Sequence, residues 1–513
     1  MSERLLILDF GSQYTHLISA VLSSLAVPSM IEPADIDCEE FLQKSDRQEI
    51  KGIILTGGAQ SVFDEAIAFD HAWLVADLPV LGICYGHQLI ARLAGGRVER
   101  SVGEYGRETV HRIKRTSLNS GLPFESVIWV SHNDKITTLP PEYESTESTL
   151  SDENTGIQHK VKKIYGLQYH PEVSHTVGGS KILENFAFNI CKIERQTPWQ
   201  PSDFIKQATQ HYREVIGDKK VVTALSGGVD STVLATLLRK FLPKEQLLAV
   251  YVDTGLEPSS AKQDVLAFCK DFDIQLEIRE AASHFFDGLK GITDPDKKRS
   301  VVGHQFIKEF GLVAKAIQAD IFAQGTIWSD VIESGVTKFS STIKPHHNVG
   351  GLPEQLPFQL IEPLRQLFKH QVRELATFFH LPEAIVHKRV FPGPGFALRV
   401  DGEVTPDKVE IVRQCTDIIE TVLADSDLDT RDVMGFAVYI EVKSSGIKGD
   451  SRVTNEYAIV VRIVETKNLM TANFSQRVFP LLADISNRIT QMTGCGKVLY
   501  DITNKPPSTI DWQ

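Results

Sequence analysis

Val221-Val222-Thr223-Ala224-Leu225-Ser226-Gly227-Gly228-Val229-Asp230-Ser231-Thr232 is the stretch of this chain that says most about its fold. The first five residues are apolar or β-branched, as in a strand that is buried on both faces of a sheet. A serine and two glycines break this run, and an amphipathic helical pattern begins at Val229. A buried strand that passes through a glycine-rich turn into a helix is typical of parallel α/β domains. We therefore predict the α/β fold class.

The turn in this stretch has the composition of an anion-binding loop. Glycines let backbone N–H groups turn toward an anion at a helix N-terminus, and hydroxyl groups add further donors. The loop lacks the lysine that reaches the γ-phosphate in the G-x-x-x-x-G-K-[ST] motif. Asp230 is a suitable Mg²⁺ ligand, because this cation prefers a carboxylate together with phosphate oxygens. A glycine pair after a strand is usually structural, but the whole string predicts an ATP site formed by Ser226, Gly227, Gly228, Val229, Asp230, Ser231 and Thr232.

A second strand-to-helix turn lies earlier, at Gly82-Ile83-Cys84-Tyr85-Gly86. A nucleophile on such a turn needs small neighbours, because the backbone is tight and the side chain must stand clear of the sheet. The helix N-terminus favours a thiolate at Cys84. The backbone N–H of Tyr85, and another from the turn that contains Gly58, would donate to an oxyanion.

A base for this cysteine is supplied by His170-Pro171-Glu172. His170 and Glu172 are two positions apart at the end of an apolar run, so in a strand their side chains point to the same side. This suits an imidazole base whose tautomer is held by a carboxylate. A lone cysteine is usually a buried structural residue, but the glycine turn and the distant histidine together favour a catalytic Cys84.

Composition limits the class of protein. The chain has 513 residues, which suggests roughly three domains. Its net charge of −12 argues against nucleic-acid binding. The six scattered cysteines form no C-x-x-C pair, which argues against a disulfide framework or zinc site and suits a reducing cytosol. The start reads as a strand rather than a signal peptide, and no apolar run could span a membrane. We expect a cytoplasmic protein without a membrane or nucleic-acid partner.

Two breaks divide the chain. The polar, proline-containing stretch at 194–203 reads as a linker, with a helix expected from Asp203 and Ser202 or Asp203 as its N-cap. Pro392-Gly393-Pro394-Gly395 is a strong breaker. We expect domains at residues 1–195, 203–395 and 396–513.

Each expected domain has its own pattern of strands and helices. The first should hold a largely parallel sheet, with strands Leu5–Phe10, Gly52–Leu55, Pro79–Ile83, Val127–Ser131 and Ile164–Tyr169 and helices after Gly11, at Ala66–Ala76 and at Gly86–Ala94. The second should hold strands Val221–Leu225, Leu248–Val252, Ile274–Ile278 and Ile321–Gln324. The third reads as a small α+β unit, a type that often forms a dimer interface: helix Lys408–Leu423, strands Phe436–Val442 and Tyr457–Val464, helix Arg477–Met492 and strand Lys497–Ile502.

The two turns resemble those of known enzyme families. The cysteine turn with its histidine and glutamate resembles the class I glutamine amidotransferases, whose triad hydrolyses glutamine to glutamate and ammonia. That resemblance makes Cys84 the nucleophile, His170 the base and Glu172 its orienting acid. The glycine turn resembles the PP-loop of N-type ATP pyrophosphatases, which adenylate a carbonyl oxygen and release pyrophosphate. In that family the acid that ends the next strand lies near the nucleotide, and here it is Asp253.

The order of the three segments is similar to that of the glutamine-hydrolysing GMP synthase family over essentially the whole chain. Matching stretches stand at residues 8–14, 169–173, 343–353, 361–365, 391–395 and 505–510. In that family of carbon–nitrogen ligases, ATP adenylates the C2 oxygen of xanthosine monophosphate (XMP), and ammonia from glutamine displaces AMP to give GMP. The resemblance implies glutamine, ATP and XMP as substrates, Mg²⁺ as a cofactor with ATP, and a homodimer formed by the third segment.

The same resemblance assigns further site residues. It implies that the nucleotide contacts Arg299, Lys505, Thr509, Ile510 and Asp511. It also implies a lid over the reacting phosphates that carries Lys344, His346 and His347. The charge and donors of these three side chains, beside a glycine pair that allows a hinge, suit such a role.

Several positions depart from the usual family pattern: Ala59, His87, Asn133, Thr254–Pro258, Val390 and the ending Asp511-Trp512-Gln513. These departures leave open a divergent paralogue that amidates another purine nucleotide by the same chemistry. An NAD synthase or tRNA-thiolating PP-loop enzyme is less consistent with this cysteine centre and an acidic chain. A non-catalytic nucleotide sensor is less consistent with the intact residues Cys84, His170, Glu172, Asp230 and Ser231.

Overall fold

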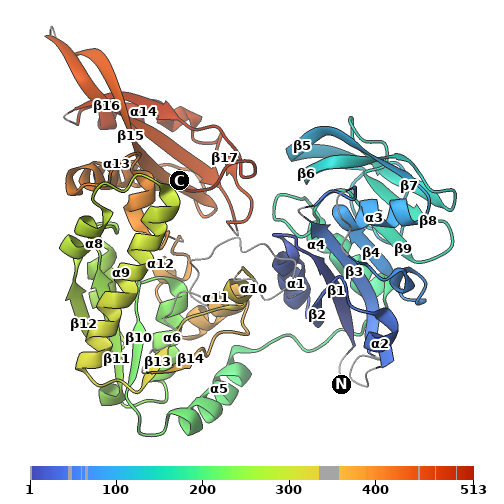
Figure 1. The fold of residues 1–513 in the computed structure, drawn as a ribbon, viewed down its shortest axis with the longest axis horizontal. Helices are drawn as coiled ribbons and strands as arrows, with labels where there is room; N and C mark the ends of the chain where they lie inside the picture. The colour runs from blue at the N-terminus through green and yellow to red at the C-terminus, as the bar shows by residue number, and fades with distance from the viewer. Residues whose placement is uncertain are drawn as a thin grey trace.

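The computed structural model describes residues 3–43, 49–58, 60–63, 68–333, 358–389, 391–448, 451–467, 469–492 and 494–513. Three sheets and the helices around them make up these parts of the chain, as Figure 1 shows. We call them the first, second and third units in chain order. The predicted α/β class is confirmed, since the first two units alternate strands and helices. The expected lid residues Lys344, His346 and His347 lie outside the described residues.

The first unit is built on a sheet with the strand order β2-β1-β3-β4-β9-β8-β7-β5-β6. Its strands are β1 (Arg4–Phe10), β2 (Ser29–Pro33), β3 (Ile50–Gly58), β4 (Val80–Ile83), β5 (Arg97–Arg112), β6 (Glu125–Thr138), β7 (Tyr143–Ser148), β8 (Gly156–His159) and β9 (Ile164–Leu167). The pairings from β2 to β9 are parallel, and those from β9 to β6 are antiparallel. The expectation of a largely parallel sheet is therefore wrong for one half. Strands such as β5 are half exposed and lack the apolar runs typical of parallel strands.

The helices of the first unit are α1 (Thr15–Ser24), α2 (Cys38–Gln43), α3 (Tyr85–Leu93) and α4 (Gly179–Glu184), with a π-helical turn at Asn185–Ile190. The helix expected at Ala66–Ala76 is wrong in the part that is described, where only a 3₁₀ turn forms at His71–Leu74. The Asp70 carboxylate accepts hydrogen bonds from Ala72 N and Cys38 N, each at 2.9 Å. This side chain, rather than helical packing, therefore fixes the local backbone.

The second unit carries a parallel sheet with the order β12-β11-β10-β13-β14. Its strands are β10 (Val221–Ala224), β11 (Leu247–Asp253), β12 (Gln275–Glu280), β13 (Ile321–Ala323) and β14 (Gln359–Ile361). Its helices are α5 (Pro201–Ile216), α6 (Val229–Arg239), α7 (Ala261–Asp271), α8 (Ala282–Leu289), α9 (Pro295–Ala316), α10 (Trp328–Glu333), α11 (Lys369–Phe378) and α12 (Glu383–Val386). The expected start of α5 at Asp203 is wrong. The helix begins at Pro201 after Gln200, because proline is well suited to the first helical turn.

The third unit has the predicted order of helix, strand, strand, helix and strand, with one short extra strand. Its elements are α13 (Pro406–Ala424), β15 (Val433–Lys448), β16 (Ser451–Glu465), β17 (Asn473–Phe474), α14 (Leu482–Thr490) and β18 (Cys495–Tyr500). β16 pairs antiparallel with β15 and β17 and parallel with β18.

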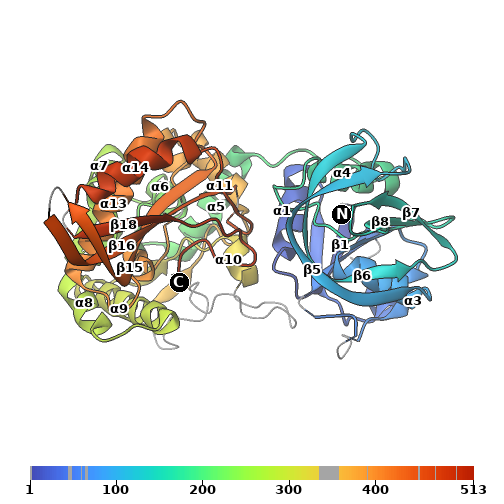
Figure 2. The same cartoon turned by 90° about the horizontal axis from the view of Figure 1, so that it is seen from above.

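The hydrophobic cores show how the units are joined. Val222 and Val250 of the second sheet belong to the same buried cluster as Phe396, Val412 and Ile459 of the third unit. The first unit has separate clusters on the two faces of its sheet. Figure 2 shows the second and third units packed together, with the first unit beside them. In the described parts of the chain, we find no helix with the length and apolar character needed to cross a membrane.

Candidate active sites

Cys84 lies on a strained turn between β4 and α3. Its φ of 52° and ψ of −104° are rarely adopted by residues with side chains. The Cys84 N–H donates to Leu167 O at 2.7 Å, which ties the turn to β9. A Cβ atom on Gly82 would lie 2.6 Å from the backbone of Gly86, so this tight turn requires the glycine.

His170 and Glu172 form a buried pair beside this cysteine. His170 Nδ1 lies 2.7 Å from Glu172 Oε1, which leaves Nε2 for Cys84. A Cβ atom on Gly57 would lie 3.3 Å from His170 Cε1 and 3.6 Å from Cys84 Cβ, so both side chains lie against the same glycine. Burial lowers the pKa of His170, but the Glu172 carboxylate and the Cys84 thiol outweigh this effect and raise the pKa to about 10. The structure therefore brings the three predicted residues together.

A pocket of about 720 Å³ opens onto Cys84 and His170. Gly58 and Tyr85, which were predicted to donate to an oxyanion, both line it and are in contact, since a Cβ atom on Gly58 would lie 3.4 Å from the Tyr85 ring. Polar residues that sequence reasoning missed complete the wall, among them Gln88, Arg100, Tyr105, His132 and Asp134. They come from three elements, α3, β5 and β6, so no single short motif could have indicated them. This size and polarity suit a small amide substrate.

Two departures from the family pattern lie at or near this pocket. Asn133 lines it, and its side-chain oxygen accepts a hydrogen bond from the Tyr105 hydroxyl at 2.6 Å. His87 is completely buried below it, and burial lowers its pKa to about 3. The imidazole is therefore neutral and acts as packing against Gly166.

The predicted phosphate loop connects β10 to α6. Gly227 has a φ of 75°, which favours glycine. Ser226 Oγ accepts from Gly228 N at 3.3 Å and lies 3.2 Å from Ser231 Oγ. Thr232 Oγ1 donates to Gly228 O at 2.8 Å. These contacts fold the loop over the first turn of α6, where N–H groups can face an anion.

Asp230 has the environment of a cation ligand. Its Oδ2 accepts from Lys369 Nζ at 2.6 Å, and its buried Oδ1 has no hydrogen-bond partner among the described residues. A buried carboxylate oxygen of this kind fits Mg²⁺, which prefers oxygen ligands. Lys388 approaches the other side of the loop, because its Nζ would lie 3.4 Å from a Cβ atom on Gly227. Both lysines lie far along the chain, where sequence reasoning could not connect them with the loop.

Asp253 lies at the end of β11, as predicted. Its Oδ1 accepts from Gly255 N at 3.1 Å, and its Oδ2 pairs with Lys262 Nζ at 3.3 Å. The sequence lacks the basic residue that usually follows this aspartate in the family. Here Arg413 of α13 covers the same turn and donates to Gly255 O at 2.7 Å and to Glu257 O at 3.0 Å.

The C-terminal tail folds back onto a group of arginines. Buried Arg462 donates to Thr509 O at 2.6 Å and to Ile510 O at 2.7 Å. Arg399 pairs with Asp511 at 3.3 Å. Arg299 donates to the backbone oxygen of Gln513 at 2.5 Å.

Thr509, Ile510 and Asp511 lie in the tail, and Arg299 of α9 binds the last residue of the tail. Four of the five residues predicted to contact the nucleotide are thus gathered at the end of the chain. The Lys505 side chain lies apart from them, where it donates to Leu469 O at 2.7 Å.

Comparison with family models agrees with this arrangement. The model described as "Glutamine amidotransferase class-I" matches residues 6–190, which hold Cys84, His170 and Glu172. The model described as "NAD synthase" matches residues 201–297, which hold the phosphate loop. The model described as "GMP synthase C terminal domain" matches residues 421–512. The fold and the triad therefore define the first unit as a class I glutamine amidotransferase.

Full-length relatives narrow the class further. "GMP synthase [glutamine-hydrolyzing]" of Brachyspira hyodysenteriae is 42% identical over 100% of this chain and 99% of its own length. Proteins of the same description from Lactobacillus gasseri and Bacillus licheniformis are 42% and 40% identical, over 100% of this chain and 98% and 99% of their own lengths. The chain belongs to the family of glutamine-hydrolysing GMP synthases. The match to the NAD synthase model is confined to the phosphate-loop segment, whereas this similarity extends over the whole chain.

Proposed function

We propose that this chain converts XMP to GMP with glutamine and ATP, and that the residues described above perform the two half-reactions. The observation that carries the proposal is the coexistence, on one chain, of the buried Cys84-His170-Glu172 group and a phosphate loop without a γ-phosphate lysine. Similarity to GMP synthases along the whole length supports the choice of XMP.

In the first half-reaction, the Cys84 sulfur attacks the side-chain carbonyl of glutamine. The N–H groups of Gly58 and Tyr85 hold the resulting oxyanion. His170 gives a proton to the leaving ammonia, and Glu172 keeps its ring oriented. Water activated by His170 then hydrolyses the thioester to glutamate.

In the second half-reaction, the loop Ser226–Thr232 and Asp253 hold ATP. The C2 oxygen of XMP attacks the α-phosphorus and pyrophosphate leaves, after which ammonia displaces AMP from the adenylated carbon. Because its Oδ1 has no hydrogen-bond partner in the described parts of the chain, Asp230 is the residue that would hold Mg²⁺. This cation, when bound, neutralises phosphate charge and stabilises the leaving pyrophosphate.

We assign these steps to domains at 1–195, 203–395 and 396–513. Arg299, Thr509, Ile510 and Asp511 bind XMP together with Lys505, and Lys344, His346 and His347 serve as the lid. The third domain forms a homodimer, which is supported by its exposed apolar side chains Val442, Ile447 and Leu499. Both half-reactions take place in the cytoplasm.

The test supplies XMP, Mg-ATP and ammonium salts to the purified chain without glutamine. We expect GMP, AMP and pyrophosphate in equal amounts, because an adenylated intermediate releases AMP. Stoichiometric ADP and phosphate would contradict the adenylation step. If another purine nucleotide in a parallel panel were converted faster than XMP, that nucleotide would be the substrate instead of XMP.

A further inference from the structure

Residues 469–474 of the third unit, which we call the connecting segment, pack directly against the glutaminase centre. Met470 is buried in a cluster with Tyr14, Trp129 and Val173 of the first unit. The Tyr14 ring in turn lies edge-on to His170, with 4.7 Å between the ring centroids. Part of the third unit therefore reaches the shell of side chains around the catalytic histidine.

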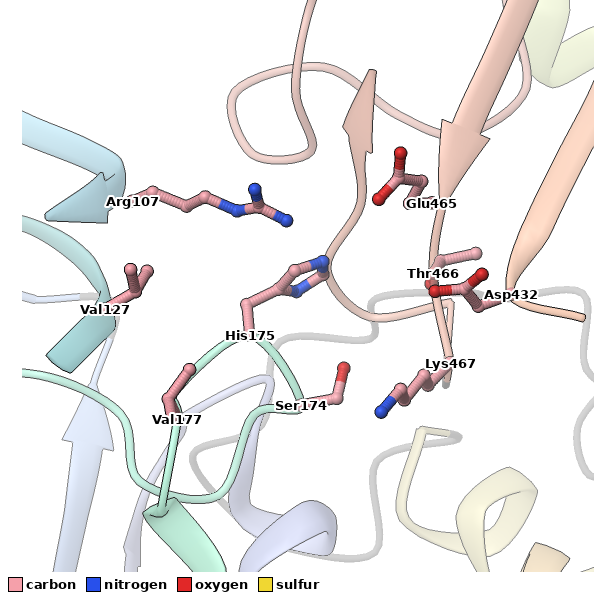
Figure 3. A pocket seen from close by; sticks show the side chains of 9 residues that line it. All are labelled: Arg107, Val127, Ser174, His175, Val177, Asp432, Glu465, Thr466 and Lys467. Atoms are coloured by element: carbon pink, nitrogen blue, oxygen red, sulfur yellow. The ribbon is translucent and has the colours of Figure 1, made fainter. Parts of the chain in front are cut away.

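His175 makes the polar contact at this junction. Figure 3 shows His175 and Arg107 extending from the first unit toward Glu465 and Thr466 of the third. His175 Nδ1 lies 2.7 Å from Thr471 Oγ1, and the fully buried hydroxyl can donate to it.

Asn473 completes the contact when its amide oxygen faces the first unit. This oxygen accepts from His175 Nε2 at 2.9 Å and from two nitrogens of Arg107 at 3.0 Å. A single neutral tautomer of His175, protonated at Nε2, satisfies both ring nitrogens. Burial and the nearby Arg107 charge lower the pKa of His175 to about 4, so the ring is neutral near pH 7.

The loop that carries His175 is fixed to the catalytic histidine. Thr176 Oγ1 donates to His170 O at 2.6 Å and accepts from Trp129 N at 3.1 Å. The Trp129 ring lies 4.8 Å from the His175 ring, centroid to centroid. A shift of His175 would therefore be passed through Thr176 to the backbone of His170.

The connecting segment is also tied to the tail. Ala472 and Lys505 exchange two backbone hydrogen bonds, at 3.0 and 2.8 Å. The Lys505 ammonium donates to the backbone oxygen of Leu469, at the start of the connecting segment. From Lys505 the chain runs on to Thr509 and Asp511, which we assign to XMP. One continuous set of contacts thus links the tail to the glutaminase centre.

We propose that His175 is a positioning residue, whose contacts with Thr471 and Asn473 transmit the state of the nucleotide tail to His170. Glutamine is then hydrolysed fastest when the nucleotide site is filled, so ammonia is released when an acceptor is present. This inference rests on the proposed function, because it takes the tail as part of the XMP site.

The experiment measures three rates for the full-length chain: glutamine hydrolysis alone, glutamine hydrolysis with XMP and Mg-ATP, and GMP synthesis from ammonia. Coupling between two sites typically amounts to about 5- to 150-fold. We expect nucleotides to stimulate wild-type hydrolysis on the order of 10-fold. His175→Ala should lose most of this stimulation, with the other two rates within about twofold of wild type.

Matched variants separate positioning from general packing. His175→Asn should restore part of the stimulation, because its side-chain amide can bond the Thr471 hydroxyl. Ser174→Ala removes an exposed hydroxyl from the neighbouring position and should behave as wild type. Thr471→Val should lose stimulation as His175→Ala does, and the double variant should lose little more, since both remove one contact.

Three outcomes would overturn the proposal: full stimulation in a folded His175→Ala protein, no stimulation of the wild type, or an equal loss of all three rates. A wild-type chain that makes no GMP from ammonia would instead contradict the proposed substrate. The two failures are therefore distinguishable.

Discussion

Cys84 holds a backbone conformation that usually costs on the order of 1–3 kcal/mol for a residue with a side chain. The turn persists because the backbones of Gly82 and Gly86 are in close contact and because Cys84 N is bound to β9. This strain lifts the thiol away from the sheet toward His170. The residue pattern at this turn could be predicted, since the glycines and the cysteine are adjacent in sequence.

Removal of the thiol tests the division of labour between the two centres. Cys84→Ala should reduce glutamine-dependent GMP synthesis on the order of 10⁴-fold or more, because Cys84 supplies the sulfur of the thioester. Synthesis from high ammonium at alkaline pH should remain, since free ammonia can reach the second centre from solution. Glu172→Ala should have a smaller effect because Glu172 orients the base. Equal loss of both activities in folded Cys84→Ala protein would refute the separation.

At the scale of elements, the sequence predicted what neighbouring residues decide and missed what distant ones decide. The strands β1, β4, β10 and β11 were recognisable because they are buried apolar runs. In the antiparallel half of the first sheet, β9 and the apolar centre of β6 were predicted, whereas β5, β7 and β8 escaped because their exposed or half-exposed faces mix polar and apolar residues. Lys369 reaches Asp230 only after the chain has crossed to α11, so its role could not be seen in a local motif.

The first turn of α6 gives a prediction for the ATP site. Asp230→Asn removes the charge that would hold Mg²⁺ and that pairs with Lys369. We expect release of AMP and pyrophosphate to fall by at least 100-fold, as is common when a positioned charge at a reacting phosphate is lost. Hydrolysis of glutamine without nucleotides serves as the control and should not change. Unaltered pyrophosphate release over a range of Mg²⁺ concentrations would argue against this ligand.

The tail gives a second prediction at this scale. A chain that ends after Ile502 loses Thr509 and Ile510, the partners of buried Arg462. Its Michaelis constant for XMP should rise at least tenfold, while basal glutamine hydrolysis remains. Asp511→Asn keeps the full chain length, weakens only the pair with Arg399 and should raise the constant less. Unchanged XMP dependence in both variants would make the tail a packing element only.

At the scale of the whole molecule, the junction between the first and third units should respond to pH. Unfolded His175 takes up a proton near pH 6.5, whereas burial in the folded chain lowers its pKa to about 4. The unfolded state binds more protons in this window, so the free energy of unfolding should fall as the pH falls from about 6.5 to 4. His175→Asn should show a weaker decline in urea unfolding at pH 5 relative to pH 7.5. Parallel declines in both proteins would contradict the assignment.

The buried cluster that spans the second and third units has a consequence for where this polypeptide could be divided. A cut between residues 195 and 200 would leave an amino-terminal fragment with both of its own cores intact. A cut near Pro392 would expose apolar surface on both sides, since Val222 and Ile459 would lose a common interior. The two parts on either side of the first cut could therefore be expressed from separate genes and reassociate through Met470 and His175. The second would give insoluble halves.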